Sequence, residues 1–228
     1  MTRRYELAWL AADDNVETAT HVAPAIAEFE EAFSAFARGT VIATTDGPVA
    51  VEDLVPGMEA VTGDTTAERI MWIGSMSVFP ARPGTRIETA TMTRITADAF
   101  GMGRPTPDLL LGPWARIMLR DARCRAATGA SAAYAPAKAF MDGVSIIEVT
   151  PIAPVTAFHV VLERQGSIRA AGLELESYHP GHNLSERLDP QLATMFMSLF
   201  PHLRSAGEFG PLAHPRLTGP EVEAALLG

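Results

Sequence analysis

The stretch Ala35–Thr62, AFARGTVIATTDGPVAVEDLVPGMEAVT, carries the strongest local structural signal in this sequence. Its run Val41–Thr44 places alternate side chains on opposite faces, as a half-buried strand does. Asp46-Gly47 then supplies a turn, because glycine reaches positive φ at no steric cost, and a second short run extends from Val49 to Leu54. Pro56-Gly57 breaks the chain again. We therefore expect a β-hairpin unit here.

Working outward from this unit, further short apolar or alternating runs predict additional strands. They lie at residues 70–74, 85–95, 109–111, 117–119, 144–149, 155–162, 168–171 and 173–176. Turn signals separate them every ~8–12 residues, which is typical of an all-β sandwich-like or barrel-like body. Residues 97–107, rich in glycine and proline, predict an irregular connection, and residues 126–135 predict a loop.

Helical periodicity flanks the β-rich part. Residues 24–35 show apolar side chains at three- and four-residue spacing, with Glu28, Glu30 and Glu31 on the other face, and predict an amphipathic helix. Before it we expect a short strand or surface segment at residues 4–11 and a polar link. Two more helices are expected near residues 189–200 and 218–227.

These patterns divide the chain into three parts. Residues 1–34 form an N-terminal extension with an amphipathic helix, residues 35–178 form a β domain, and residues 179–228 form a C-terminal helical appendix packed on it. The expected fold class is mainly β, with one N-terminal helix and two C-terminal helices.

Composition limits the classes of partner and compartment. The chain has 228 residues, a net charge of −9 and a pI near 5.1, and an acidic surface repels the phosphate backbone of nucleic acids. A single cysteine, Cys124, excludes an intrachain disulfide and a zinc–thiolate site and favours a reducing compartment. No run approaches the ~20 apolar residues of a membrane span, and the N-terminus lacks a signal-peptide core. We expect a cytoplasmic protein without metal, cofactor or membrane partner.

The order of motifs in the first stretch resembles the opening block of the hedgehog/intein (Hint) superfamily, and most closely that of stand-alone bacterial Hint-domain proteins. The matching elements are Phe36, Gly39-Thr40, Asp46-Gly47, the run Val51–Leu54 and Pro56-Gly57. The resemblance implies a flattened, horseshoe-like β structure with pseudo-twofold halves. It also implies intramolecular peptide-bond cleavage, begun by a cysteine that precedes the aromatic residue.

In this chain the position of that cysteine is occupied by Ala35. The second block of the family carries Ser or Thr, two residues, and then His; here Gly112 and Ala115 occupy these places. In the third block His159 matches a polar residue that assists proton transfer, and Ser177 falls where inteins carry the terminal asparagine. The resemblance covers roughly residues 35–178.

Several other side chains are candidates for chemistry or binding. Ser34 is a candidate shifted nucleophile, and Asn183 follows His182 in a displaced His-Asn pair. Trp114 and Arg116, beside the vacated histidine position, are candidates for binding another protein or peptide. The group His179, His182 and Asp189, with Glu176 nearby, matches no zinc spacing.

Two hypotheses follow. The first is a Hint-fold protein that no longer cleaves itself and serves as a binding or structural module, because loss of an activated nucleophile and its base removes catalysis. The alternative is an autoprocessing domain of the protein-splicing type. It would be either inactivated by engineered substitutions or weakly active through Ser34 or Asn183. Gly112 and Ser177 argue against engineering, since deliberate changes rarely extend to flanking motif residues.

Overall fold

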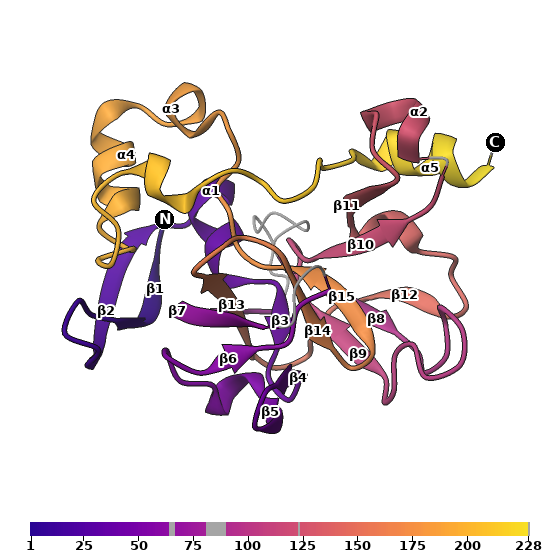
Figure 1. Ribbon diagram of the computed structural model, residues 1–228, viewed down its shortest axis with the longest axis horizontal. Coiled ribbons are helices and arrows are strands. Elements are labelled where there is room, and N and C mark those ends of the chain that lie inside the picture. The colour runs from indigo at the N-terminus through magenta and orange to yellow at the C-terminus, as the bar shows by residue number, and fades with distance from the viewer. Residues whose placement is uncertain (64–66, 81–89, 123, 228) are drawn as a thin grey trace.

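The longest strand, β7 (Glu68–Val78), takes part in both sheets of the protein (Figure 1). The computed structural model describes residues 1–63, 67–80, 90–122 and 124–227. The first residues of β7 pair with β6 (Glu59–Ala60), while most of its length pairs with β13 (Val155–Leu162) on one side. On its other side, Trp72 to Ser75 pair with β1 (Thr2–Leu10). β7 thus ties the N-terminal extension to the β body.

Every ladder between named strands is antiparallel. One sheet has the strand order β2-β1-β7-β13-β3-β9-β8-β12. Its strands not yet introduced are β2 (Val16–Pro24), β3 (Phe36–Ala37), β9 (Leu109–Leu111), β8 (Met92–Ile95) and β12 (Ile146–Val149). The other sheet has the strand order β11-β10-β15-β14-β4-β6-β7. Its strands not yet introduced are β11 (Ala132–Pro136), β10 (Arg116–Arg120), β15 (Leu173–Glu176), β14 (Ser167–Ala170) and β4 (Val41–Thr44). β5 (Gly47–Ala50) pairs with β4.

The predicted hairpin is confirmed. β4 and β5 are joined by Thr45 and Asp46, and Gly47 adopts φ +115°, a conformation that favours glycine. Ile42 and Thr44 are buried while their neighbours are half-exposed, which is the alternation expected for β4. The chain then enters a 3-10 turn, η2 (Val51–Asp53), instead of continuing as a strand.

The N-terminal part differs from the expectation. Residues 16–24 form β2, where the sequence suggested only a polar link. The predicted helix at residues 24–35 shrinks to α1 (Ala27–Glu30) and the 3-10 turn η1 (Glu31–Phe33). Glu30 and Glu31, assigned to an exposed face, are buried. Ion pairs to arginines distant in sequence explain this, and helical periodicity cannot show them.

The predicted loop at residues 126–135 is also wrong in part. It contains the end of α2 (Cys124–Thr128) and most of β11. Alanine has weak strand propensity, but β11 pairs along its whole length with β10 and its small side chains fit a buried layer. The irregular connection at residues 97–107 is confirmed. Of the strand expected at residues 85–95, residues 85–89 lie outside the described part.

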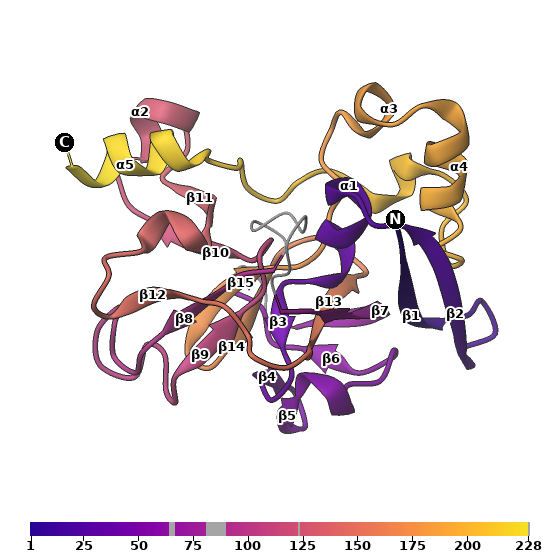
Figure 2. The same ribbon diagram turned by 180° about the vertical axis from the view of Figure 1, so that it is seen from behind.

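After β15 the chain turns helical, with α3 (Leu184–Arg187), α4 (Pro190–Met197), the 3-10 turn η5 (Ala206–Phe209) and α5 (Gly219–Leu227). Asp189 caps α4, its carboxylate accepting from Leu192 N at 2.9 Å. Figures 1 and 2 show α4 beside the N-terminal hairpin and α5 beside α2 at the far end of the molecule. The connecting segment crosses the β body, and η4 (Ala137–Phe140) lies near α5. No helix among the described residues is both long and apolar enough to span a membrane.

Two large buried clusters form the core. One lies inside the β body around Phe36, Ile42 and Leu111. The second contains the aromatic side chains of the N-terminal extension, β7 and the C-terminal segment, namely Tyr5, Trp9, Phe29, Phe33, Trp72, Tyr178, Phe196, Phe200 and Phe209. Trp72 Nε1 donates to Leu199 O at 2.8 Å within it. The extension and the appendix therefore share a core with the strands between them.

Candidate functional site

The Ser34–Ala35 peptide bond, which corresponds to the cleaved bond in the family that the chain resembles, lies in a buried ladder. Ala35 N donates to Phe158 O at 2.9 Å, and Ala35 O accepts from Gly112 N at 2.8 Å. Ser34 O accepts from Trp114 N at 3.3 Å. The bond is thus held on both sides by backbone from β13 and from the turn after β9. The Ala35 side chain is a buried methyl group and offers no nucleophile.

Gly112 makes the closest approach to this bond. A β-carbon at Gly112 would lie 2.2 Å from the Ser34 carbonyl oxygen and 3.3 Å from Ala35 N. Any side chain at this position, including the hydroxyl-bearing residue of the family, would require the backbone to move. Gly112 is therefore required by packing, and the space for a hydroxyl group is filled by the carbonyl.

The second vacated position is equally closed. Ala115 is buried, its N–H donating to Gly112 O at 3.2 Å and its carbonyl accepting from Ala137 N at 2.9 Å. Its neighbour Trp114 is half-buried, and Lys138 Nζ lies 5.9 Å from the Trp114 ring centre. The indole Nε1 of Trp114 is buried and has no hydrogen-bond partner among the described residues.

His159 is the one ionisable side chain at the family positions, and it lies on β13 between two segments. Nδ1 is 3.0 Å from Glu31 O and Nε2 is 3.3 Å from Glu176 O. Burial lowers the pKa of His159 to about 4, so the ring is neutral at pH 7 and donates to only one of the two carbonyls. In this arrangement the imidazole holds together backbone segments rather than facing a reacting group.

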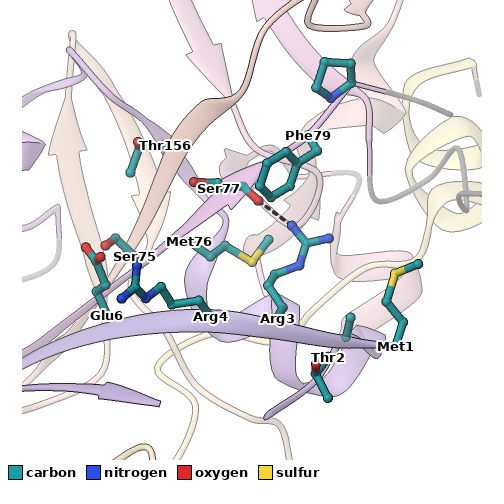
Figure 3. Close-up of a pocket in the computed structure, with 12 residues that line it drawn as sticks. Met1, Thr2, Arg3, Arg4, Glu6, Ser75, Met76, Ser77, Phe79 and Thr156 are labelled. Atoms are coloured by element: carbon teal, nitrogen blue, oxygen red, sulfur yellow. Dashed lines mark hydrogen bonds between the residues drawn. The ribbon is translucent and has the colours of Figure 1, made fainter. Parts of the chain in front are cut away.

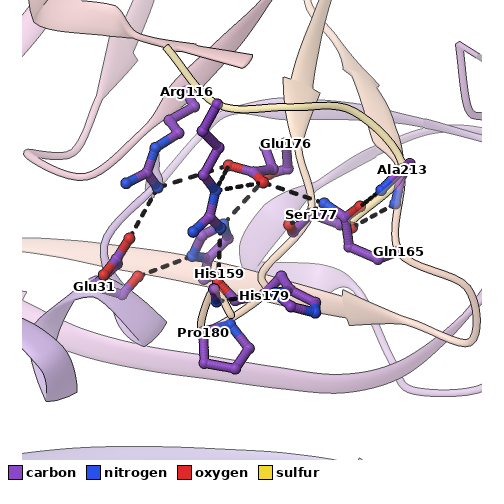
Figure 4. Close-up of polar contacts among 12 residues, drawn as sticks. Glu31, Arg116, His159, Gln165, Glu176, Ser177, His179, Pro180 and Ala213 are labelled. Atoms are coloured by element: carbon purple, nitrogen blue, oxygen red, sulfur yellow. Dashed lines mark hydrogen bonds and ion pairs between the residues drawn. The ribbon is translucent and has the colours of Figure 1, made fainter. Parts of the chain in front are cut away.

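Around His159 lies a cluster of ion pairs, buried apart from Arg187, that joins all three parts of the chain (Figure 4). From the N-terminal extension, Glu31 contacts Arg116 (Oε1 to Nη1, 2.9 Å) and Arg187 (Oε2 to Nη1, 3.7 Å). From the β body, Glu176 accepts from Arg216 Nε at 2.9 and 3.1 Å and lies 3.6 Å from Arg116 Nη1. Arg187 and Arg216 come from the C-terminal segment. We call these five residues the ion cluster.

The electrostatics of the ion cluster favour charged Glu31. Burial alone would raise the pKa of this carboxyl, but the charges of Arg116, Arg216 and Arg187 hold it below its usual value. The guanidinium of Arg116 is correspondingly held protonated by Glu31 and Glu176 despite burial. Arg116, expected to bind a partner, is thus committed to intramolecular pairs.

The remaining predicted residues lie in different settings. Ser177 is buried and its Oγ accepts from Gly166 N at 3.1 Å. Ser34 is buried and its Oγ donates to Glu30 O at 2.8 Å. Asn183 is exposed where α3 begins, and within the described residues its side chain has no hydrogen bond to the ion cluster or to His159. The structure therefore brings together Ala35, His159 and the segments around them, but not Asn183.

No sequence pattern signals the ion cluster, because Glu31 and Arg216 are separated by most of the chain. No group of three or more His, Cys, Asp or Glu side chains in the described part is arranged to hold a metal ion.

A cavity of about 670 Å³ opens where β1 and β7 stop pairing (Figure 3). Arg3 crosses this gap and donates to Ser77 O, and Met76 and Phe79 supply apolar walls.

Comparisons with known proteins identify a family for this chain. The family model described as the Hint domain matches residues 34–182. The chain is similar to the solution structure of a bacterial intein-like domain from Clostridium thermocellum, with 13% identity and a TM-score of 0.44 over 64% of this chain and 99% of that chain. No curated protein matches the sequence. Because the family model spans well over half of the 228 residues, the chain belongs to the Hint-domain family.

Proposed function

We propose that this chain is a Hint-domain protein that does not cleave itself and serves as a structural and binding module. The contact between Gly112 and the Ser34 carbonyl carries this proposal. It places backbone where a catalytic hydroxyl would stand, in addition to the missing groups at Ala35 and Ala115. Members of a catalytic unit act together, so the loss of all three removes the activation that peptide-bond rearrangement needs.

The position of the N-terminal extension supports the same proposal. In an autoprocessing protein, the segment before the cleaved bond is released. Here that segment pairs with β7, contributes Phe29 and Phe33 to a buried aromatic cluster, and supplies Glu31 to the ion cluster. Cleavage at Ser34 would separate elements that share a core, which favours a role in which the chain stays whole.

The alternatives have less support. Ser34 already donates its hydroxyl to Glu30 O, and no base lies against it among the described contacts. Asn183 is exposed and followed by Leu184, apart from the ion cluster. Engineered inactivation would have to account for Gly112 as well as two alanines, and Gly112 is required by the packing around it.

The binding part of the proposal concerns another protein or a peptide, without metal or cofactor. The cavity between β1 and β7 supports it, since it combines apolar walls with the polar edge of two strands, as a peptide-binding groove does. We further propose a cytoplasmic location, because the sequence contains a single cysteine, Cys124, and therefore no intrachain disulfide.

Intact-mass measurement of freshly purified full-length protein tests the absence of self-cleavage. The sample is measured at once and after days at neutral pH, with and without hydroxylamine, which traps an ester intermediate. We expect one mass near 24.4 kDa throughout. Fragments that begin at Ser34 or Ala35, or that end at Asn183, would overturn the proposal and identify the reacting bond.

A further inference from the structure

Among the described strands, β2 pairs only with β1 and so forms an outer edge of its sheet. The ladder runs from Thr2 opposite Pro24 to Leu10 opposite Val16 without a bulge. Figures 1 and 2 place β2 at one end of the molecule, outside β1. An edge of this length exposes a row of backbone donors and acceptors to other chains.

The direction of these backbone groups follows from the ladder. Ala25 N donates to Met1 O at 3.1 Å immediately beyond its end, so odd-numbered residues of this segment face β1. Along an antiparallel pair, the backbone N–H and C=O groups of successive residues point alternately toward the partner strand and away from it. Those of Thr18, Thr20 and Val22 therefore point away from the sheet. These three residues have no backbone hydrogen bond to any described segment.

The edge lacks the features that usually prevent strand pairing. Between Val16 and Ala23 there is no lysine, no proline and no bulge, and Glu17 is the only carboxylate. Val22 is 68% exposed and Val16 is 43% exposed. The edge of β11 contrasts with this, because Tyr134 N donates to Pro215 O there and the C-terminal segment covers the strand.

The sequence of β2 is complementary to itself about Thr20. If two copies lie antiparallel with Thr20 opposite Thr20, all nine residues of the strand overlap. Thr18 then lies opposite Val22, a β-branched pair that stabilises a sheet. Glu17 lies opposite Ala23, so no two like charges face each other. The outward N–H and C=O groups of Thr18, Thr20 and Val22 in each copy would form about six backbone hydrogen bonds, two for each pair of facing residues.

We propose that two copies of this chain associate through β2, antiparallel about a two-fold axis at Thr20, so that their sheets become continuous. The occupant of the edge is thus a second copy rather than an unrelated peptide. The inference rests on the strand edge alone and is independent of whether the chain cleaves itself.

Cysteine cross-linking tests the register. Residues facing each other as a hydrogen-bonded pair have Cα atoms about 5.5 Å apart, within the range that a disulfide spans. In a Cys124→Ala background, Thr20→Cys should therefore give a covalent dimer on mild oxidation. Thr18→Cys alone should not, because two copies of residue 18 lie about 14 Å apart in this register. A mixture of Thr18→Cys and Val22→Cys copies should cross-link again.

Mass in solution tests the association itself. We expect light scattering to show a concentration-dependent approach to twice the chain mass of 24.4 kDa. Thr20→Pro removes only an outward N–H and should give a monomer whose circular dichroism matches that of the unmodified chain. Thr20→Lys, which keeps the backbone intact, should do the same if the proline variant folds poorly. A chain that stays monomeric at hundreds of micromolar would overturn the proposal. A dimer that persists in Thr20→Lys would also overturn it. So would a dimer that forms a disulfide equally well through Val144→Cys, a position outside β2.

Discussion

Arg116 Nη1 lies 2.9 Å from Glu31 Oε1, and this contact joins the two segments between which a self-cleaving Hint domain would react. Glu31 stands three residues before Ser34, and Arg116 directly follows the position of the missing histidine. Since both groups are largely buried, their mutual attraction is weakly screened by solvent. This ion pair attaches the N-terminal extension to the β body beside the positions that the family uses for chemistry.

The first prediction concerns the charge of Glu31. Glu31→Gln leaves three arginines facing one carboxylate, and removing one partner of a buried pair typically costs about 3–5 kcal/mol. We expect a loss of about 3 kcal/mol in the free energy of unfolding at pH 7, measured by urea denaturation. The lowered pKa of Glu31 means that its contribution is present above its unfolded pKa and is lost as the pH falls through the folded value. The deficit of the variant should therefore shrink in acid.

Glu28→Gln is the matched control, because Glu28 lies in the same helical segment and is only half-buried. It should change the free energy of unfolding by no more than about 0.5 kcal/mol. Equal losses in the two variants would show that helix composition, and not the ion cluster, is responsible.

A second prediction tests the packing at Gly112. Gly112→Ser restores the hydroxyl-bearing residue type of the family but places a β-carbon 2.2 Å from the Ser34 carbonyl oxygen. Overpacking of this kind costs about 1–3 kcal/mol. Gly166→Ser is the control, since no atom lies within 4 Å of a β-carbon there and its φ is not in the left-handed region. Thermal melts should show a clear drop for the first variant and a much smaller change for the second.

A third prediction asks whether the missing groups alone abolish the reaction. Ala35→Cys combined with Ala115→His returns the nucleophile and the histidine without opening the space beside Gly112. We expect this double variant to keep a single intact mass in the presence of hydroxylamine or thiol, because the Ser34 carbonyl remains packed against the turn after β9. Fragments ending at Ser34 would show instead that the scaffold is still competent and that only side chains were lost.

Local sequence patterns predicted the β body well. The hairpin after Gly39, the strands β9, β13 and β15, and the two C-terminal helices all depend on neighbouring residues, which a linear pattern records. The Hint resemblance depended likewise on ordered blocks within residues 35–178.

Long-range pairing accounts for what the sequence could not predict. Strand β2 is a polar segment whose strand form depends on its nine-residue ladder with β1. The spacing of Phe29 and Phe33 is helical, but the chain leaves the helix after one turn so that Glu31 can meet Arg116. Charges brought together from distant segments leave no periodic signal, so the ion cluster was not predicted.

The last prediction concerns His202, whose two ring nitrogens are buried without a hydrogen-bond partner among the described residues. Burial lowers the pKa of His202 to about 4. The unfolded chain takes up this proton near pH 6.5 and the folded chain only near pH 4, so stability from the neutral ring is present above pH ~6.5. That stability is lost as the pH falls toward 4.

His202→Leu removes this linkage and the unpaired nitrogens together. The variant should be at least as stable as the unmodified chain at pH 7, and its advantage should grow by up to about 3 kcal/mol between pH 7 and pH 4. Denaturation at several pH values measures this difference. His182→Gln, at an exposed histidine, should follow the unmodified chain throughout. A constant gap between His202→Leu and the unmodified chain across this range would show that His202 has the same proton affinity in the folded and unfolded states. In that case water reaches its ring, and the acid sensitivity of the protein must come from other groups such as His159 and Glu31.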